Sequence, residues 1–238
     1  MHEEHQKLNE HPHIEKHFGA GPRVRDAILG MSDGLTVPFA LAAGLTGAVD
    51  SSTIIIAAGL AEIAAGSVSM GLGGYLAAQN EAEHYAHELK HERYEIEHMP
   101  DHEREEVIEI FEEYGLTKAD LGPVLRHFEE HPDDWVNFMM KHELGLDKPD
   151  ERAGIRSALT IAGAYVVGGI IPLSPYFFTD DLTTALLFST AFTAIALCVF
   201  GWFKSRLIGS SPLKGAVRTL AIGGAAAAVA YGLARLLS

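Results

Sequence analysis

One apolar stretch of the chain runs directly into a strongly charged one. Residues 53–79 read TIIIAAGLAEIAAGSVSMGLGGYLAAQ, and residues 80–99 continue as NEAEHYAHELKHERYEIEHM. The apolar part is about as long as a helix that crosses a bilayer. No proline separates it from the charged part, so nothing in the sequence forces the helix to end there. We therefore predict one long helix that leaves a membrane and continues into water.

Four more apolar runs lie outside this stretch. The first covers residues 26–49, and the short polar turn 50–52 makes it an antiparallel neighbour of the run that follows. The other runs are residues 153–178, residues 182–203 and a weaker one near residues 213–237, which Lys214, Arg218 and Arg235 shorten. The sequence predicts an all-α integral membrane protein with five transmembrane helices. Four spans and a surface helix are the alternative.

The net charge of the chain is confined to the segment between the second and third runs. Residues 80–152 contain 22 Asp and Glu against 8 Lys and Arg, whereas the rest of the chain contains ten of each. Apolar side chains recur there with helical spacing, and Pro100, Gly115, Pro132 and Gly145 mark helix starts and ends. We predict an inserted helical domain of three or four helices. Its acidity favours a cationic partner and argues against nucleic acid.

These patterns divide the chain into four parts. They are a polar, His-rich N-terminal tail (1–22), transmembrane helices 1 and 2 (23–79), an acidic metal-binding helical domain (80–152) and transmembrane helices 3 to 5 (153–238). The sequence leaves open whether the five histidines of the tail bind metal. The single cysteine, Cys198, excludes disulfides within the chain and thiolate clusters.

The distribution of basic residues predicts the orientation in the membrane. Lys and Arg near the ends of the spans collect on one side, and the turns 50–52 and 173–181 contain none. Because basic flanks favour the cytosol, we expect the N-terminus and the acidic domain to be cytosolic. The basic residues are Arg23, Arg25, Arg152, Arg156, Lys204, Arg206, Lys214 and Arg218.

Two carboxylates and a thioether lie within the apolar runs. An ionisable group at membrane depth is costly and marks a pathway or a binding site. With 1.5 Å of rise per residue, Glu62 lies roughly 14 Å from the outer end of the second span. Asp33 lies roughly 10 Å from the cytosolic end of the first span, near the level of Met70. Carboxylates and a thioether suit a divalent transition ion, but they do not select among Fe(II), Mn(II), Co(II) and Zn(II). An empty carboxyl in low dielectric favours its protonated form, so we expect a bound ion to displace a proton.

The acidic domain carries a second set of candidate ligands. Carboxylates and histidines follow one another at steps of three or four residues, which places them on common helix faces. A solvated acidic surface is the alternative, but the density and the interleaved histidines favour metal binding. The candidate ligands on these faces are Glu81, His84, Glu88, His91, Glu92, Glu95, Glu103, Glu106, Met139, Met140 and Glu143.

Three long motifs resemble the vacuolar iron transporter family, in its plant form. They are SDGLTVPFALAAGL (32–45), AEIAAGSVSMGLGGYLAAQNE (61–81) and GGIIPLSPYFF (168–178). The resemblance implies a homodimer in the vacuolar membrane that moves Fe(II) from the cytosol into the vacuole in exchange for protons. It also implies a pathway between the two protomers, lined by the first span. It assigns Asp33, Glu62 and Met70 to the membrane site. In the cytosolic domain the resemblance narrows the metal ligands to Glu92, Glu95, Glu103, Glu106, Met139, Met140 and Glu143.

We therefore expect a proton-coupled antiporter rather than an enzyme. Its metal ions are transported or bound cargo, and no prosthetic group is expected. Two alternatives remain. One is a membrane-tethered iron buffer with ferritin-like chemistry, in which pairs such as Glu95 and His98 would bind two irons. The other is a metal-gated divalent cation channel.

Overall fold

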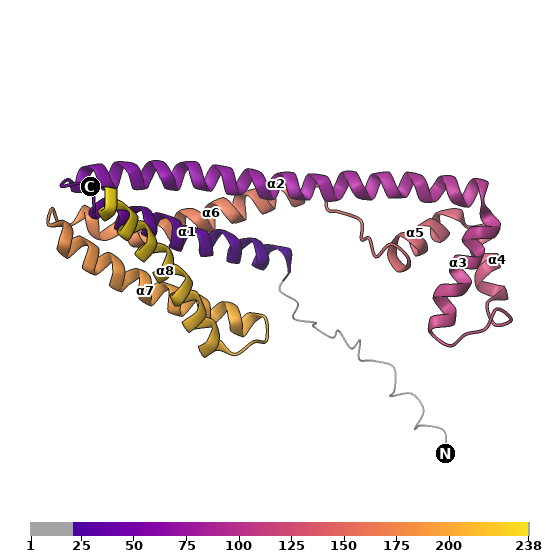
Figure 1. Cartoon of the computed structure of the whole chain (residues 1–238). Helices are drawn as coiled ribbons and strands as arrows, with labels where there is room; N and C mark the ends of the chain where they lie inside the picture. The colour runs from indigo at the N-terminus through magenta and orange to yellow at the C-terminus, as the bar shows by residue number, and fades with distance from the viewer. Residues whose placement is uncertain (1–20, 238) are drawn as a thin grey trace, which may run out of the picture. The chain divides into compact units, whose positions relative to one another are not determined.

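The computed structural model describes residues 21–237, and within them all regular structure is helical, with no β-strand. Figure 1 shows the order of the elements along the chain. They are α1 (Pro22–Thr46), α2 (Ser52–His98), α3 (Pro100–Glu113), α4 (Gly122–Glu130), α5 (Pro132–His142), α6 (Ala153–Leu173), the 3-10 helix η1 (Ser174–Phe177), α7 (Leu182–Leu207) and α8 (Pro212–Leu237). The prediction of an all-α protein is confirmed.

Five of these helical segments are long and apolar enough to cross a membrane, as predicted. They are α1, α2, α6 with η1, α7 and α8. Many of their large apolar side chains face outward, including Val68, Leu159 and Leu187, each about 70 % exposed. In water such a surface would be unfavourable, whereas in lipid it is the expected one. The weakest predicted span, α8, is also long and apolar enough to cross a membrane.

The long helix predicted from residues 53–98 is present as one element. α2 has 47 residues without a break, which corresponds to roughly 70 Å of helix. A bilayer core needs only about 20 helical residues. α2 is therefore long enough to span a membrane and to extend well beyond it (Figure 1).

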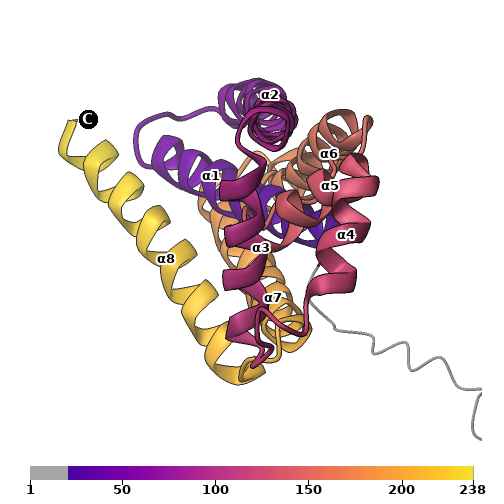
Figure 2. The ribbon, with the colours of Figure 1, turned by 90° about the vertical axis from the view of Figure 1, so that its right-hand side faces the viewer.

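The chain divides into two compact units. The first contains the described residues up to Ser67 and those from Ile161 onward. Here α8 packs along both α1 and α7, and Figure 2 shows the short loop that joins α7 to α8. A buried cluster of Ala42, Ile55, Ile63, Leu173 and Tyr176 holds the helices together.

Glycines let the helices of the first unit approach closely. A Cβ atom added at Gly34 would lie 2.8 Å from Cα of Tyr165, and one added at Gly168 would lie 2.9 Å from the backbone N of Leu35. A glycine or a proline in a membrane helix permits either close approach of a neighbouring helix or a local break, and α1 contains both, Gly34 and Pro38. The structure shows close approach, because α1 continues through Pro38.

The second unit, Val68–Thr160, contains the acidic domain. The end of α2 joins α3, α4 and α5 around a buried cluster, which consists of Ile96, Val107, Phe128, Trp135, Val136, Met139 and Met140. Gly115 follows α3 with φ +85° and Gly145 follows α5 with φ +65°, a region that glycine adopts without strain. The helix boundaries predicted from Gly115, Pro132 and Gly145 are therefore close to those observed.

Candidate metal-binding sites

Glu62 lies on the apolar half of α2 and is held by one side chain from α6. The Tyr165 hydroxyl donates a hydrogen bond to Oε1 of Glu62. The second oxygen, Oε2, is buried and has no hydrogen-bond partner among the described residues. A buried polar atom without a partner is uncommon and costly, and one explanation is a ligand that binds there. This oxygen is the candidate metal ligand.

Tyr165 is wedged where α1, α2 and α6 meet. Its side chain is 2 % exposed, and its backbone lies against Gly34, the neighbour of Asp33. A Cβ atom at Gly66 would lie 2.8 Å from Cε1 of the Tyr165 ring, so the missing side chain at Gly66 makes room for the ring. Sequence reasoning missed Tyr165, since 103 residues separate it from Glu62 and no spacing rule links them. A buried tyrosine in an apolar run needs a hydrogen-bond partner for its hydroxyl, and this need is the one feature of the sequence that points to Tyr165.

Asp33 and Met70, the other predicted membrane ligands, are both half-buried. Asp33 lies on α1 in the first unit, one residue from the contact between Gly34 and Tyr165. Met70 lies on α2, eight residues after Glu62, in the second unit. That Asp33 and Met70 share one level of the membrane stays a prediction.

Two acidic side chains are buried in the second unit. Glu92 on α2 is 3 % exposed and Glu103 on α3 is 1 % exposed. Each has one carboxyl oxygen, Oε1 of Glu92 and Oε2 of Glu103, that is buried without a hydrogen-bond partner among the described residues. Burial, followed by the negative charge of Glu103, raises the pKa of Glu92 to about 9. Burial also raises the pKa of Glu103.

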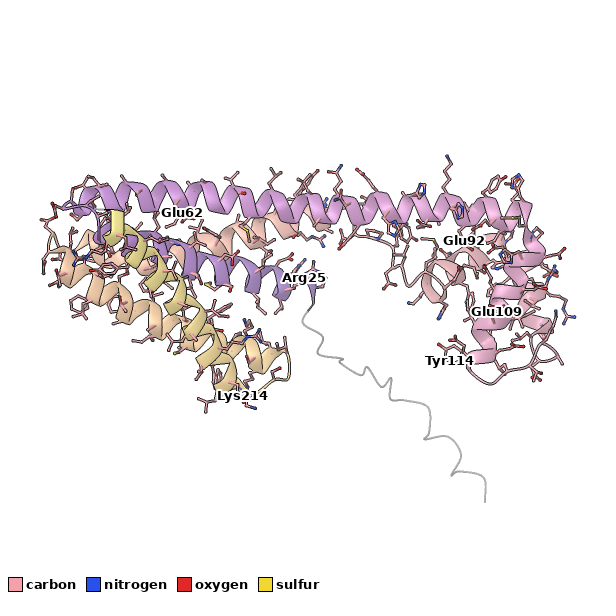
Figure 3. All side chains as sticks on the ribbon, in the orientation of Figure 1. Arg25, Glu62, Glu92, Glu109, Tyr114 and Lys214 are labelled. Atoms are coloured by element: carbon pink, nitrogen blue, oxygen red, sulfur yellow. The ribbon has the colours of Figure 1, made fainter. Side chains whose placement is uncertain are left out.

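The other predicted carboxylates of the acidic domain interact electrostatically with Glu92 and Glu103. Glu143 is exposed as a residue, yet partial burial of its carboxyl and the charges of Glu106, Glu103 and Glu95 raise its pKa to about 7. Glu95 and Glu143 in turn raise the pKa of Glu92. Each of the five predicted carboxylates therefore lies within electrostatic reach of at least two of the others. Figure 3 shows Glu92 on the charged half of α2 and Glu62 on its apolar half.

Histidines border this acidic cluster, which we define as Glu92, Glu95, Glu103, Glu106 and Glu143. His91 Nδ1 lies 2.9 Å from Oε2 of Glu95, and His102 Nε2 lies 3.6 Å from Oε1 of Glu106. His102 also lowers the pKa of both Glu103 and Glu143. The resemblance assigned no role to His102, although its spacing to Glu106 places both on one face of α3.

The carboxylates are grouped but do not form a finished coordination site. Between residues 21 and 237, no three His, Cys, Asp or Glu side chains converge with the geometry that would hold a metal ion. Carboxylates repel one another when no cation lies between them, so the empty arrangement is expected to be looser than a loaded one. The tail histidines lie outside the described residues.

The two candidate methionine ligands lie in the apolar core. Met139 is 0 % and Met140 is 1 % exposed, and both pack in the cluster with Ile96, Val107 and Trp135. Methionine commonly fills such cores. Packing alone therefore accounts for both positions, and their role as ligands stays a prediction.

Comparison with known proteins places this arrangement in a family. The family model described as "VIT family" matches residues 24–235. Vacuolar iron transporter 1 of Oryza sativa subsp. japonica is 52 % identical over 94 % of this chain and 89 % of its own length. Vacuolar iron transporter 1 of Arabidopsis thaliana is 51 % identical over 98 % of this chain and 93 % of its own length. Protein CCC1 of Saccharomyces cerevisiae is 38 % identical over 91 % of this chain and 70 % of its own length. The match covers the helices that carry Asp33, Glu62 and the acidic cluster, and this chain belongs to the VIT family.

Proposed function

We propose that this protein carries Fe(II) across the vacuolar membrane, from the cytosol into the vacuole, in exchange for protons. The observation that carries the proposal is Glu62, a carboxylate in an apolar helix with one buried oxygen that no described residue satisfies. Such a group is too costly to serve packing alone. The names of the relatives, vacuolar iron transporters from several plants, supply the metal and the membrane.

Exchange follows from the chemistry of a carboxyl group in low dielectric. With no metal bound, the neutral acid is favoured because the charged form is poorly solvated. A divalent cation binds only the anion, so loading expels the proton, and reprotonation from the acidic lumen releases the metal. Asp33 and Met70 are the further ligands of this site in the proposal. Mn(II), Co(II) and Zn(II) are further candidate cargoes, because the ligand types do not discriminate among them.

In the proposal, the acidic domain collects the cation before transport. Residues 80–152 face the cytosol together with the N-terminus, as the basic flanks of the spans favour. The acidic cluster binds the metal with Met139 and Met140 as soft ligands. Two copies of the chain form a homodimer, and the pathway runs between them along α1.

Flux measurements in proteoliposomes test the proposal directly. The purified protein is reconstituted with a lumenal pH dye, and Fe(II) uptake is followed under anaerobic conditions. Wild type should take up Fe(II) as protons leave, Glu62→Ala should abolish uptake, and Glu92→Ala should weaken it. Glu109→Ala, which removes an exposed carboxylate of α3 outside the acidic cluster, is the matched control. Uptake that moves no protons and ignores an imposed pH gradient would exclude antiport.

A membrane-tethered iron buffer is the second candidate, because Glu92 and Glu103 bury partnerless oxygens in the acidic domain itself. A buffer would lose its bound iron in Glu92→Ala, and its iron flux would be the same in wild type, Glu62→Ala and Glu92→Ala. A channel, by contrast, would carry iron only downhill and independently of protons.

A further inference from the structure

The surroundings of the Glu62 carboxylate are not symmetric. Oε1 accepts the hydrogen bond from Tyr165, whereas Oε2 is buried without a partner among the described residues. A carboxylate can chelate a metal ion only if both oxygens can turn toward it. We propose that Tyr165 is a positioning residue that restricts Glu62 to monodentate coordination through Oε2 and thereby biases the membrane site against Ca(II). This inference rests on the proposed function, because it concerns how the same site selects its cation.

The packing around Tyr165 prevents the hydroxyl from moving aside. The ring fills the space that the missing side chain of Gly66 leaves on α2, and the backbone of Tyr165 lies against Gly34 on α1. A side chain 2 % exposed and fixed by two other helices can leave Oε1 only if the helices separate. The hydrogen bond therefore acts as a fixed constraint on the carboxylate.

Monodentate coordination separates the candidate cations by size. Ca(II) takes six to eight oxygen ligands at about 2.3–2.6 Å and commonly uses both oxygens of a carboxylate. Smaller transition ions bind carboxylate oxygens at about 2.0–2.2 Å and need fewer ligands. A Glu62 that offers one oxygen therefore meets the needs of a transition ion and leaves Ca(II) one ligand short. Loss of the Tyr165 hydroxyl would free Oε1 and restore the bidentate mode.

Tyr165→Phe tests this with a built-in comparison. The ring that packs against Gly66 remains, and only the hydroxyl is lost. Tyr176→Phe is the matched control, because Tyr176 is also 2 % exposed in the same predicted span but its hydroxyl meets Oγ1 of Thr46 at 2.8 Å, not a carboxylate. Fe(II) uptake is measured in proteoliposomes with increasing Ca(II) as competitor.

We expect Tyr165→Phe to raise the KM for Fe(II) about tenfold, as is usual when a side chain that orients a metal ligand is lost. Inhibition by Ca(II) should strengthen relative to wild type, and Tyr176→Phe should change neither quantity. A purely structural role would lower the amount of folded protein without changing the preference between the two cations. Unchanged competition by Ca(II) in Tyr165→Phe would overturn the inference.

Infrared difference spectra give a readout without transport. Co(II) is added to the purified protein, and Glu62→Gln identifies the bands of the Glu62 carboxylate. Monodentate binding gives a wide separation between the asymmetric and symmetric stretches, and bidentate binding gives a narrow one. We expect the wide separation in wild type and the narrow one in Tyr165→Phe. A narrow separation in wild type refutes the inference even if Tyr165→Phe does not fold, whereas flux without proton movement refutes only the proposed antiport.

Discussion

A divalent metal ion that binds the acidic cluster near neutral pH is expected to release protons, and their number should depend on pH. The pKa of Glu92 is raised to about 9 and that of Glu143 to about 7. At pH 7.5 Glu92 is almost fully protonated and Glu143 about a quarter, so together they release about one proton when metal requires their anions. At pH 6 both are protonated, and the release rises to about two.

Calorimetry in buffers of different ionisation enthalpy measures this release. Co(II) is titrated into the purified full-length protein at pH 7.5 and at pH 6, with Glu92→Gln and the exposed control Glu109→Gln. Glu92→Gln should lower the release by about one proton at both pH values, because it removes one titrating carboxyl. Glu109→Gln should leave it unchanged. A release that is the same in all three proteins would refute the reasoning, since the proton would then come from elsewhere.

The same pKa shifts set the pH dependence of stability for the metal-free domain. A carboxyl whose pKa is raised on folding, from 4.5 to about 9 for Glu92, contributes stability below pH 4.5 that is lost as the pH rises toward 9. At about 1.4 kcal/mol per pKa unit, the loss between pH 4.5 and pH 7.5 is at most about 4 kcal/mol for Glu92. Glu92→Gln should therefore unfold at a higher temperature than wild type at pH 8 without metal, and at a similar temperature at pH 5.

Two further substitutions test the packing. Gly34→Ala places a Cβ 2.8 Å from Cα of Tyr165, so it should destabilise the first unit by about 1–3 kcal/mol and reduce transport. Gly163→Ala, on an open face of α6, should do neither. If the two variants had equal effects on thermal unfolding and on flux, the close approach at Gly34 would be contradicted. Met139→Leu should destabilise the domain by less than about 1.5 kcal/mol, because Leu nearly conserves the volume of the buried Met139. Co(II) binding that survives the change would make this methionine a core residue rather than a ligand.

The sequence was sufficient to predict the elements of the fold but not the contacts between them. Hydropathy predicted the five spans, because lipid demands long apolar helices, and the missing proline predicted that α2 continues to His98. Pro100, Gly115 and Gly145 predicted the helix limits in the acidic domain, because their backbone preferences are local. These features depend only on neighbours along the chain.

The partner of Glu62 could not be predicted in this way. The Tyr165 hydroxyl reaches Glu62 because Gly34 and Gly66 allow α1, α2 and α6 to approach closely. The sequence of one helix does not determine how three helices pack together. The spacing of Glu92, Glu103 and Glu143 likewise gave no information on which carboxylates are buried, since the fold of α3 and α5 decides it. The thioethers of Met139 and Met140 suit both a core and a soft metal, and only burial distinguishes the two environments.

The buried, partnerless oxygens of Glu92 and Glu103 have a consequence for the lifetime of the protein. Without metal the acidic domain is locally frustrated, because two of its buried carboxyl oxygens have no hydrogen-bond partner among the described residues and burial opposes the ionisation of Glu92. A bound metal adds RT ln(1 + [L]/Kd) to its stability, so opening of the domain becomes rarer as the metal supply rises. Proteases act on opened domains. We therefore expect cells short of metal to degrade this chain faster than cells with a surplus, so that its abundance follows the supply of its cargo without any change in synthesis.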